Sequence, residues 1–135
     1  MNEKTVINWI KKANEDLKIA LDELNTQDPA SSAICFHAQQ CVEKYLKAFL
    51  IYNGKPIRKT HNITAIIKDC TDLDKSFEYL FELEADELTK YAIEVRYGEE
   101  EYFPSVDEAR KAVEIAKKVK EFVLKKLKER GFNYE

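Results

Sequence analysis

The sequence is poor in the residues that interrupt secondary structure, with three glycines and three prolines among 135 residues. Few breaks are therefore available between elements, which favours long helices. No apolar run is long enough to cross a bilayer, and the N-terminal segment MNEKTVINWIKK has charged residues where a secretion signal would be apolar. We therefore expect a cytoplasmic protein that does not enter a membrane.

Cysteine and histidine are also scarce. The three cysteines, Cys35, Cys41 and Cys70, form an odd number without a CxxC spacing, which favours neither a disulfide framework nor a zinc site. We expect them to be small buried apolar residues. The only histidines, His37 and His61, lie too far apart in sequence to give a metal-binding spacing. The sequence therefore calls for no metal and no cofactor.

The charged residues are numerous but unevenly distributed. They make up 35% of the chain, hydrophobic residues make up 44%, and the net charge of -3 argues against general coating of nucleic acid by the whole molecule. Acidic residues predominate between positions 84 and 108 and basic residues between 110 and 130. A solvated helix face explains such a lysine-rich segment more simply than an anion-binding surface does.

Apolar residues recur at helical spacing in the first half of the chain, which predicts two long helices. The first covers about Thr5–Asn25. For the second, Asp28 is the expected N-cap, with Pro29 in the first turn, and the helix continues to Asn53. Gly54 then provides the left-handed residue that commonly ends a helix.

The second half of the chain predicts one short helix and two long elements. The short helix contains Ile63, and either Thr60 or Asn62 is its expected cap. A long element follows over about Lys75–Val95, with a break near residues 82–86 whose position the pattern leaves open.

The last helix opens with an S-x-x-E capping box formed by Ser105 and Glu108, and it continues to Gly131. No β-type alternation competes with these helices. We therefore expect an all-α fold in a single domain over residues 1–135, an up-and-down four-helix bundle with a short additional helix.

The second helix is apolar on most of its circumference but carries a polar stripe. At 100° per residue, the stripe residues lie within about 80° of one another; they are His37, Gln40, Lys44 and Lys47. Buried polar groups need partners. The stripe therefore either bonds to neighbouring helices or a second subunit, or opens onto a groove that binds a phosphate or a base edge. His37 taken alone is better explained as a satisfied polar residue.

Several segments of this sequence form a recognisable pattern: Asp16-Leu17, the run CFHAQQCVEKYLKAFL ending at Leu50, Thr60-His61, and Arg96-Tyr97. Together they resemble the HEPN domain family over nearly the whole chain. The resemblance implies an all-α bundle found in prokaryotes, usually as a homodimer. It also implies a gene often placed beside that of a minimal nucleotidyltransferase, with which the protein forms a toxin-antitoxin-like pair.

Many members of the wider HEPN group are described as metal-independent endoribonucleases with an R-x4-6-H motif before the last helix. The arginine of such a motif could hold the scissile phosphate while the histidine transfers a proton. Arg96 occupies the arginine position, but Glu101, Tyr102 and Phe103 stand where the histidine is expected. The ribonuclease motif is therefore incomplete, and the sequence leaves enzymatic activity open while favouring its absence.

Two hypotheses follow. In the first, the protein is a nucleotide- or nucleic-acid-binding subunit, with a cleft lined by Lys44, Arg96 and Tyr97 and with His37 and Gln40 as further candidate ligands. No catalytic residue is then assigned. The simpler interpretation, in which Arg96 bonds to nearby acidic residues and Tyr97 packs on a helix end, has equal weight.

In the second hypothesis, the protein is a ribonuclease with a non-standard active site. Arg96 would bind the phosphate, and His37 or His61 would replace the missing histidine across the bundle or across a dimer. The thiols offer no alternative nucleophile, because an apolar environment raises the pKa of cysteine.

Overall fold

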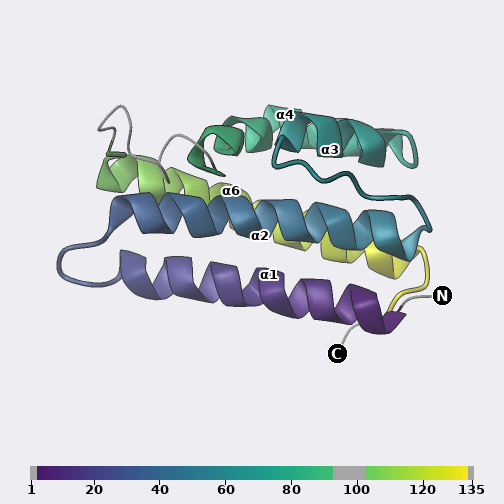
Figure 1. Ribbon diagram of the computed structural model, residues 1–135, viewed down its shortest axis with the longest axis horizontal. Helices are drawn as coiled ribbons and strands as arrows, with labels where there is room; N and C mark the ends of the chain where they lie inside the picture. Colours follow the sequence, from purple (N-terminus) through teal and green to yellow (C-terminus); the bar gives the residue numbers. More distant parts are fainter. Residues whose placement is uncertain (1–2, 93–102, 134–135) are drawn as a thin grey trace.

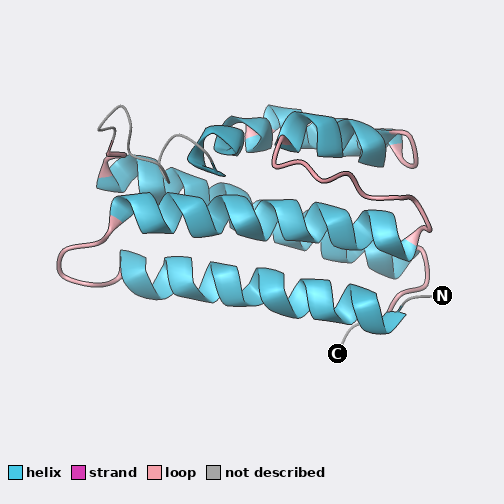
Figure 2. Ribbon diagram, in the orientation of Figure 1, coloured by secondary structure: helices cyan, strands magenta, loops and turns pink. Residues whose placement is uncertain are grey.

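The computed structural model describes residues 3–92 and 103–133, and these residues form helices and loops without any strand (Figures 1 and 2). Three long helices, α1 (Glu3–Leu24), α2 (Ser31–Tyr52) and α6 (Val106–Glu129), lie side by side in Figure 1. Helix α2 is central, because it contacts α1, α6 and the short helix α3 (Ile63–Thr71). The predicted all-α bundle is confirmed.

Helix α1 begins and ends close to its predicted bounds, and it buries one face. Its buried apolar residues recur at three- and four-residue intervals; they are Val6, Ile10, Ala13, Leu17 and Ala20. The opposite face of the helix carries lysines and acids in water. The 3.6-residue period therefore fixes which side of α1 packs against α2.

Helix α2 begins later than predicted, because Asp28 and Pro29 both precede it. Its N-cap is Ala30, whose backbone N–H donates to the carboxylate of Glu23 at 2.9 Å. No side chain that the structure describes caps the first turn of α2, so the cap expected from Asp28 is wrong. The predicted end is confirmed, since Gly54 follows the helix with φ of +73°.

The caps predicted for the later helices are also confirmed. The Asn62 side chain accepts a hydrogen bond from the Ala65 N–H at 3.2 Å and opens α3. The Ser105 hydroxyl accepts from the Glu108 N–H at 3.0 Å and opens α6. Each of these bonds satisfies one of the backbone donors that a helix start leaves without a partner.

The element expected over about residues 75–95 is broken within the predicted range of residues 82–86, in the part that the structure describes, which ends at residue 92. Two short pieces precede the break, η1 (Lys75–Glu78) and α4 (Tyr79–Glu82), and η2 (Ala85–Thr89) follows it, with residues 90–92 also helical. The break lies at Glu84, whose φ of +64° is left-handed. In a continuous helix the buried residues Leu80 and Ala85 would point about 140° apart, and the break returns both to the core.

In Figure 1, α3 and α4 lie on the side of α2 away from α1. The pieces η1, α4 and η2 therefore occupy the position of the third bundle helix. A search of the described residues for a helix long and apolar enough to span a membrane finds none.

Candidate functional site

Asp16, a buried carboxylate on α1, binds two residues of the polar stripe of α2, His37 and Lys44. We call these three residues the Asp16 network. The two oxygens of Asp16 accept hydrogen bonds from Nδ1 of His37 at 2.7 Å and from Nζ of Lys44 at 2.6 Å. Asp16 is only 6% exposed, whereas the side chains of His37 and Lys44 are 25% and 22% exposed. One buried acid thus fixes two partly exposed groups at the surface.

A second buried carboxylate, Glu43, lies on α2 itself and forms what we call the Glu43 network. It is 4% exposed and accepts from Lys47 Nζ at 2.7 Å, Gln39 Nε2 at 2.9 Å and His61 Nδ1 at 3.0 Å. Burial alone would raise the pKa of Glu43, but the hydrogen bonds from its three partners outweigh burial and lower the pKa. Glu43 is therefore ionised at neutral pH.

The stripe residue Gln40 belongs to the Glu43 network. Its Nε2 donates to Oε1 of Gln39 at 2.7 Å, and the Nε2 of Gln39 in turn donates to Glu43. Sequence reasoning missed Gln39 and Glu43, although Gln39, Glu43 and Lys47 stand at successive four-residue intervals on one helix. That spacing places the three side chains next to one another and could have revealed the network.

The two histidines are bonded to different carboxylates, so the structure does not join them in one site. Because a carboxylate cannot donate, the Nδ1 of each neutral ring carries the proton, and Nε2 is then the accepting nitrogen. The His61 side chain is 50% exposed and therefore reaches water. This arrangement could transfer a proton or hold a polar ligand at Nε2.

An open pocket of about 290 Å³ lies between α1 and α2 beside the stripe. Apolar atoms make up most of its surface. The residues that line it are Thr5, Asn8, Trp9, Lys12 and Lys44. Nζ of Lys47 lies 6.0 Å from the centre of the Trp9 ring. The pocket therefore adjoins the Asp16 network through Lys44, and its Trp9 wall lies near Lys47 of the Glu43 network.

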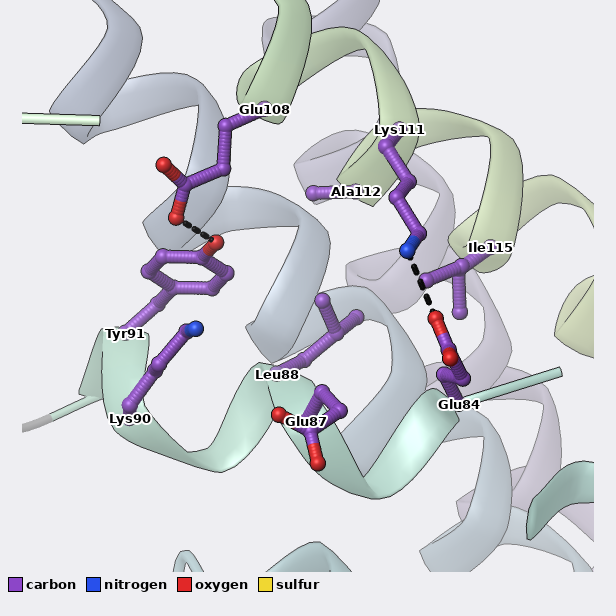
Figure 3. Close-up of a pocket in the computed structure, with 9 residues that line it drawn as sticks. All are labelled: Glu84, Glu87, Leu88, Lys90, Tyr91, Glu108, Lys111, Ala112 and Ile115. Atoms are coloured by element: carbon purple, nitrogen blue, oxygen red, sulfur yellow. Dashed lines mark hydrogen bonds and ion pairs between the residues drawn. The ribbon is translucent and has the colours of Figure 1, made fainter. Parts of the chain in front are cut away.

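A second pocket, of about 270 Å³, lies between η2 and the first half of α6 (Figure 3). The hydroxyl of Tyr91 donates to the Glu108 carboxylate at one end, and Lys111 Nζ lies 2.6 Å from Glu84 at the other (Figure 3). The ion pair raises the pKa of Lys111 and lowers that of Glu84. In the sequence, Tyr91 precedes and Glu108 follows the segment 93–102.

Arg96 and Tyr97 fall within that segment and lie outside the described residues, as do Glu101 and Tyr102. Their place in a cleft with Lys44 stays a prediction. The other candidates are described: His37 and Lys44 share Asp16, Gln40 belongs to the Glu43 network, and His61 closes that network at the surface.

The three cysteines are free and buried, as predicted. Burial raises the pKa of the Cys35 and Cys41 thiols to about 12 and also raises that of Cys70. They are protonated at neutral pH and unsuited to nucleophilic attack. Within the described ranges, no group of three or more metal-binding side chains is found.

Comparison with known proteins identifies the fold. The HEPN domain family matches residues 6–127, and the chain therefore belongs to the HEPN domain family. In Methanocaldococcus jannaschii, the protein named "Putative toxin MJ1304" is 41% identical over 61 residues, which cover 45% of this chain and 38% of that protein. The chain thus matches well under two thirds of this relative.

The fold is also similar to a solved structure, that of the protein TT1696 from Thermus thermophilus. The TM-score is 0.75 at 28% sequence identity, and the match covers 94% of this chain and 100% of that one. The family resemblance inferred from the α2 run and the Thr60-His61 segment is confirmed.

Proposed function

We propose that this HEPN protein is a nucleotide- or nucleic-acid-binding subunit of a toxin-antitoxin-type pair. Its partner would be a minimal nucleotidyltransferase, and the protein itself would be a homodimer. Membership of the HEPN family and the similarity to a protein named as a toxin support the setting. The Asp16 network supports the binding role.

The observation that carries this proposal is that Asp16 is buried, although burying a carboxylate costs free energy. Withdrawing a carboxylate from water is unfavourable by several kcal/mol, and apolar residues of similar size often serve stability as well or better. Asp16 nevertheless holds Lys44 at the edge of an open pocket, with His37 beside it. A cation already fixed in position loses little freedom when an anionic ligand binds, which favours binding over packing as the reason for the network.

The binding role is tested by retention of a labelled single-stranded RNA at several salt concentrations. Lys44→Gln and Arg96→Ala should each weaken binding and lower the salt dependence by about 0.7 in the log–log slope, as expected for one lost phosphate contact. Lys118→Ala, which removes an exposed lysine of α6, is the matched control and should change little. Binding indifferent to Lys44, Arg96 and salt would contradict the proposal.

The proposed assembly is tested by size-exclusion chromatography with light scattering. The chain alone should elute at twice its mass of 15.8 kDa. A minimal nucleotidyltransferase encoded beside it should co-elute after co-expression. A monomer that ignores the nucleotidyltransferase would contradict both parts of the assembly.

A second candidate function, metal-independent RNA cleavage, is favoured by the Glu43–His61 pair. Glu43 holds the His61 ring by Nδ1, which leaves Nε2 able to take the proton of a ribose 2′-hydroxyl. The 2′-oxygen would then bond to phosphorus, the bond from phosphorus to the 5′-oxygen would break, and the 5′-oxygen would take up a proton from solvent while His61 releases its own to solvent. Phosphate binding would fall to Arg96.

The cleavage hypothesis is tested with a mixed RNA pool in the presence of a chelator. Cutting by the wild type that is lost in His61→Ala, or in the Arg96→Ala, His37→Ala double variant, would make the protein an enzyme. Cutting that persists in all variants would identify a contaminating nuclease. Absence of cutting would favour the binding subunit.

A further inference from the structure

The pocket between α1 and α2 has the lining of a site for a flat anionic molecule. Trp9, the only tryptophan of the chain, is partly exposed and forms part of its wall. An indole face and a mostly apolar wall accept a planar ring by stacking, which is how proteins hold unpaired bases. Trp9 also packs against the hydrophobic core, which holds the ring in place.

Two lysine side chains, Lys12 and Lys44, also line the pocket. Lys12 is exposed and makes no ion pair with any residue that the structure describes, while Lys44 lines the same pocket from α2. Lys44 is bound to Asp16 through one contact of 2.6 Å, but its ammonium group has three donors and can still serve a second acceptor. Two cations therefore border the indole within one pocket.

The size of the pocket selects among anionic ligands. At about 290 Å³ it lies near the lower end of ordinary small-molecule sites. That space suits a single base with its sugar. A duplex presents its bases already stacked and paired, and offers no free face to Trp9.

We propose that this pocket binds one unpaired nucleobase, stacked on Trp9, with the attached phosphate on Lys12 and Lys44. This inference rests on the proposed binding function and specifies its ligand as a single-stranded nucleic acid or a free nucleotide. The pocket selects single strands through Trp9, and the lysines supply the sequence-independent part of the affinity.

Because Trp9 is the only tryptophan, its fluorescence reports on the pocket directly. The full chain is titrated with AMP, with pentaadenylate, with an RNA duplex and with inorganic phosphate. Saturable quenching by AMP and pentaadenylate, absent with phosphate and with the duplex, is the expected result. Quenching by AMP alone identifies a free-nucleotide site, and quenching by pentaadenylate alone identifies a single-strand site.

Variants then test the stacking. Trp9→Leu should weaken the binding of labelled pentaadenylate about ten-fold or more, whereas Trp9→Phe keeps an aromatic face and should lose less. Lys12→Ala should lower the salt slope, and Lys118→Ala should not. The melting temperature of each variant shows whether it is folded, so that the comparison of Phe with Leu holds even where Leu destabilises α1.

The outcomes separate this inference from the function on which it rests. In one outcome, RNA binding depends on Lys44 while Trp9 emission does not change and Trp9→Leu binds as tightly as the wild type. That result would overturn base binding in the Trp9 pocket and keep the proposed binding function. Equal quenching by phosphate or by the duplex would overturn base stacking. No binding of any probe would overturn both proposals.

Discussion

The two carboxylate networks of α2 differ in how they are assembled. Glu43 takes two of its partners, Gln39 and Lys47, from its own helix at four-residue spacing, and only His61 comes from elsewhere. Asp16 instead belongs to α1, and both of its partners lie on α2. The Glu43 network thus exists largely within one helix, whereas the Asp16 network forms only when two helices pack.

Their surroundings differ as well. The Lys47 side chain is 9% exposed, and its Nζ also contacts the backbone oxygen of Thr60 at 3.3 Å, so that it ties α2 to the following loop. Lys44 is more open and lines a pocket. The comparison teaches that similar groups occupy different settings: the Glu43 network fastens a loop, and the Asp16 network holds Lys44 at a pocket, where we propose that it meets a ligand.

The largest expected effect on stability comes from replacing Glu43, the more buried of the two acids. Glu43→Leu leaves the Lys47 ammonium buried without its carboxylate and should lower the free energy of unfolding by about 3–5 kcal/mol. Urea denaturation at pH 7 measures this loss. In the Glu43→Leu, Lys47→Met double variant much of the loss should be recovered, because no lone charge remains. A double variant as unstable as the sum of the two single variants would contradict the assignment.

Asp16→Asn should have a smaller effect. Its partners His37 and Lys44 are partly exposed and can turn to water, so the expected loss is about 1–3 kcal/mol, again by urea denaturation at pH 7. RNA binding should fall in the same variant, because Lys44 is no longer held in place. A loss of stability equal to that of Glu43→Leu would remove the distinction between the networks.

The lowered pKa of Glu43 predicts a smaller, pH-dependent difference. A carboxyl group whose pKa is lower in the folded state stabilises the fold above its unfolded pKa of about 4.3, and this contribution is lost as the pH falls through the folded value. The stability gap between wild type and Glu43→Gln should therefore be full at pH 7 and shrink below about pH 4. A stability difference between wild type and Glu43→Gln that stays constant from pH 7 to pH 3 would contradict this prediction.

The exposed ion pair Lys111–Glu84 is the reference, because we expect its removal to leave stability unchanged. Both groups are in water, where ions and solvent screen the attraction. Lys111→Ala should leave the melting temperature within experimental error at physiological salt. A large shift would mean that the pocket in Figure 3 contributes to stability more than its open charges indicate.

The long helices could be predicted because their apolar period and their caps are local signals. The break was predicted only to within residues 82–86, and Glu84 itself could not be singled out, since its left-handed conformation is adopted without glycine or proline and is selected by the burial of Leu80 and Ala85 on one side. The start of α2 was misplaced for a related reason, because the backbone N–H of its N-cap residue, Ala30, is bound by Glu23 of the preceding helix. Tertiary contacts decided both cases.

In the candidate site, too, the features set by local spacing could be predicted and those set by tertiary contacts could not. The stripe on α2 was visible in the sequence, and the Glu43 network was within reach of an argument from spacing. The partnership of Asp16 with His37 and Lys44 spans 21 and 28 residues and requires knowledge of how α1 and α2 pack. The role of Trp9 likewise depends on the pocket between those helices, which no spacing in α1 alone would indicate.

The buried thiols make the folded protein a poor substrate for alkylating reagents, which attack the thiolate. Each cysteine has a different neighbour: Cys35 lies near Tyr91 and Glu108, Cys41 near Asp16 and Lys120, and Cys70 has its Sγ 3.8 Å from the Leu46 carbonyl oxygen. Alkylation at each position must then wait for a different part of the bundle to open. Mass spectrometry of the labelled chain would show whether the layers around α2 separate together or one at a time.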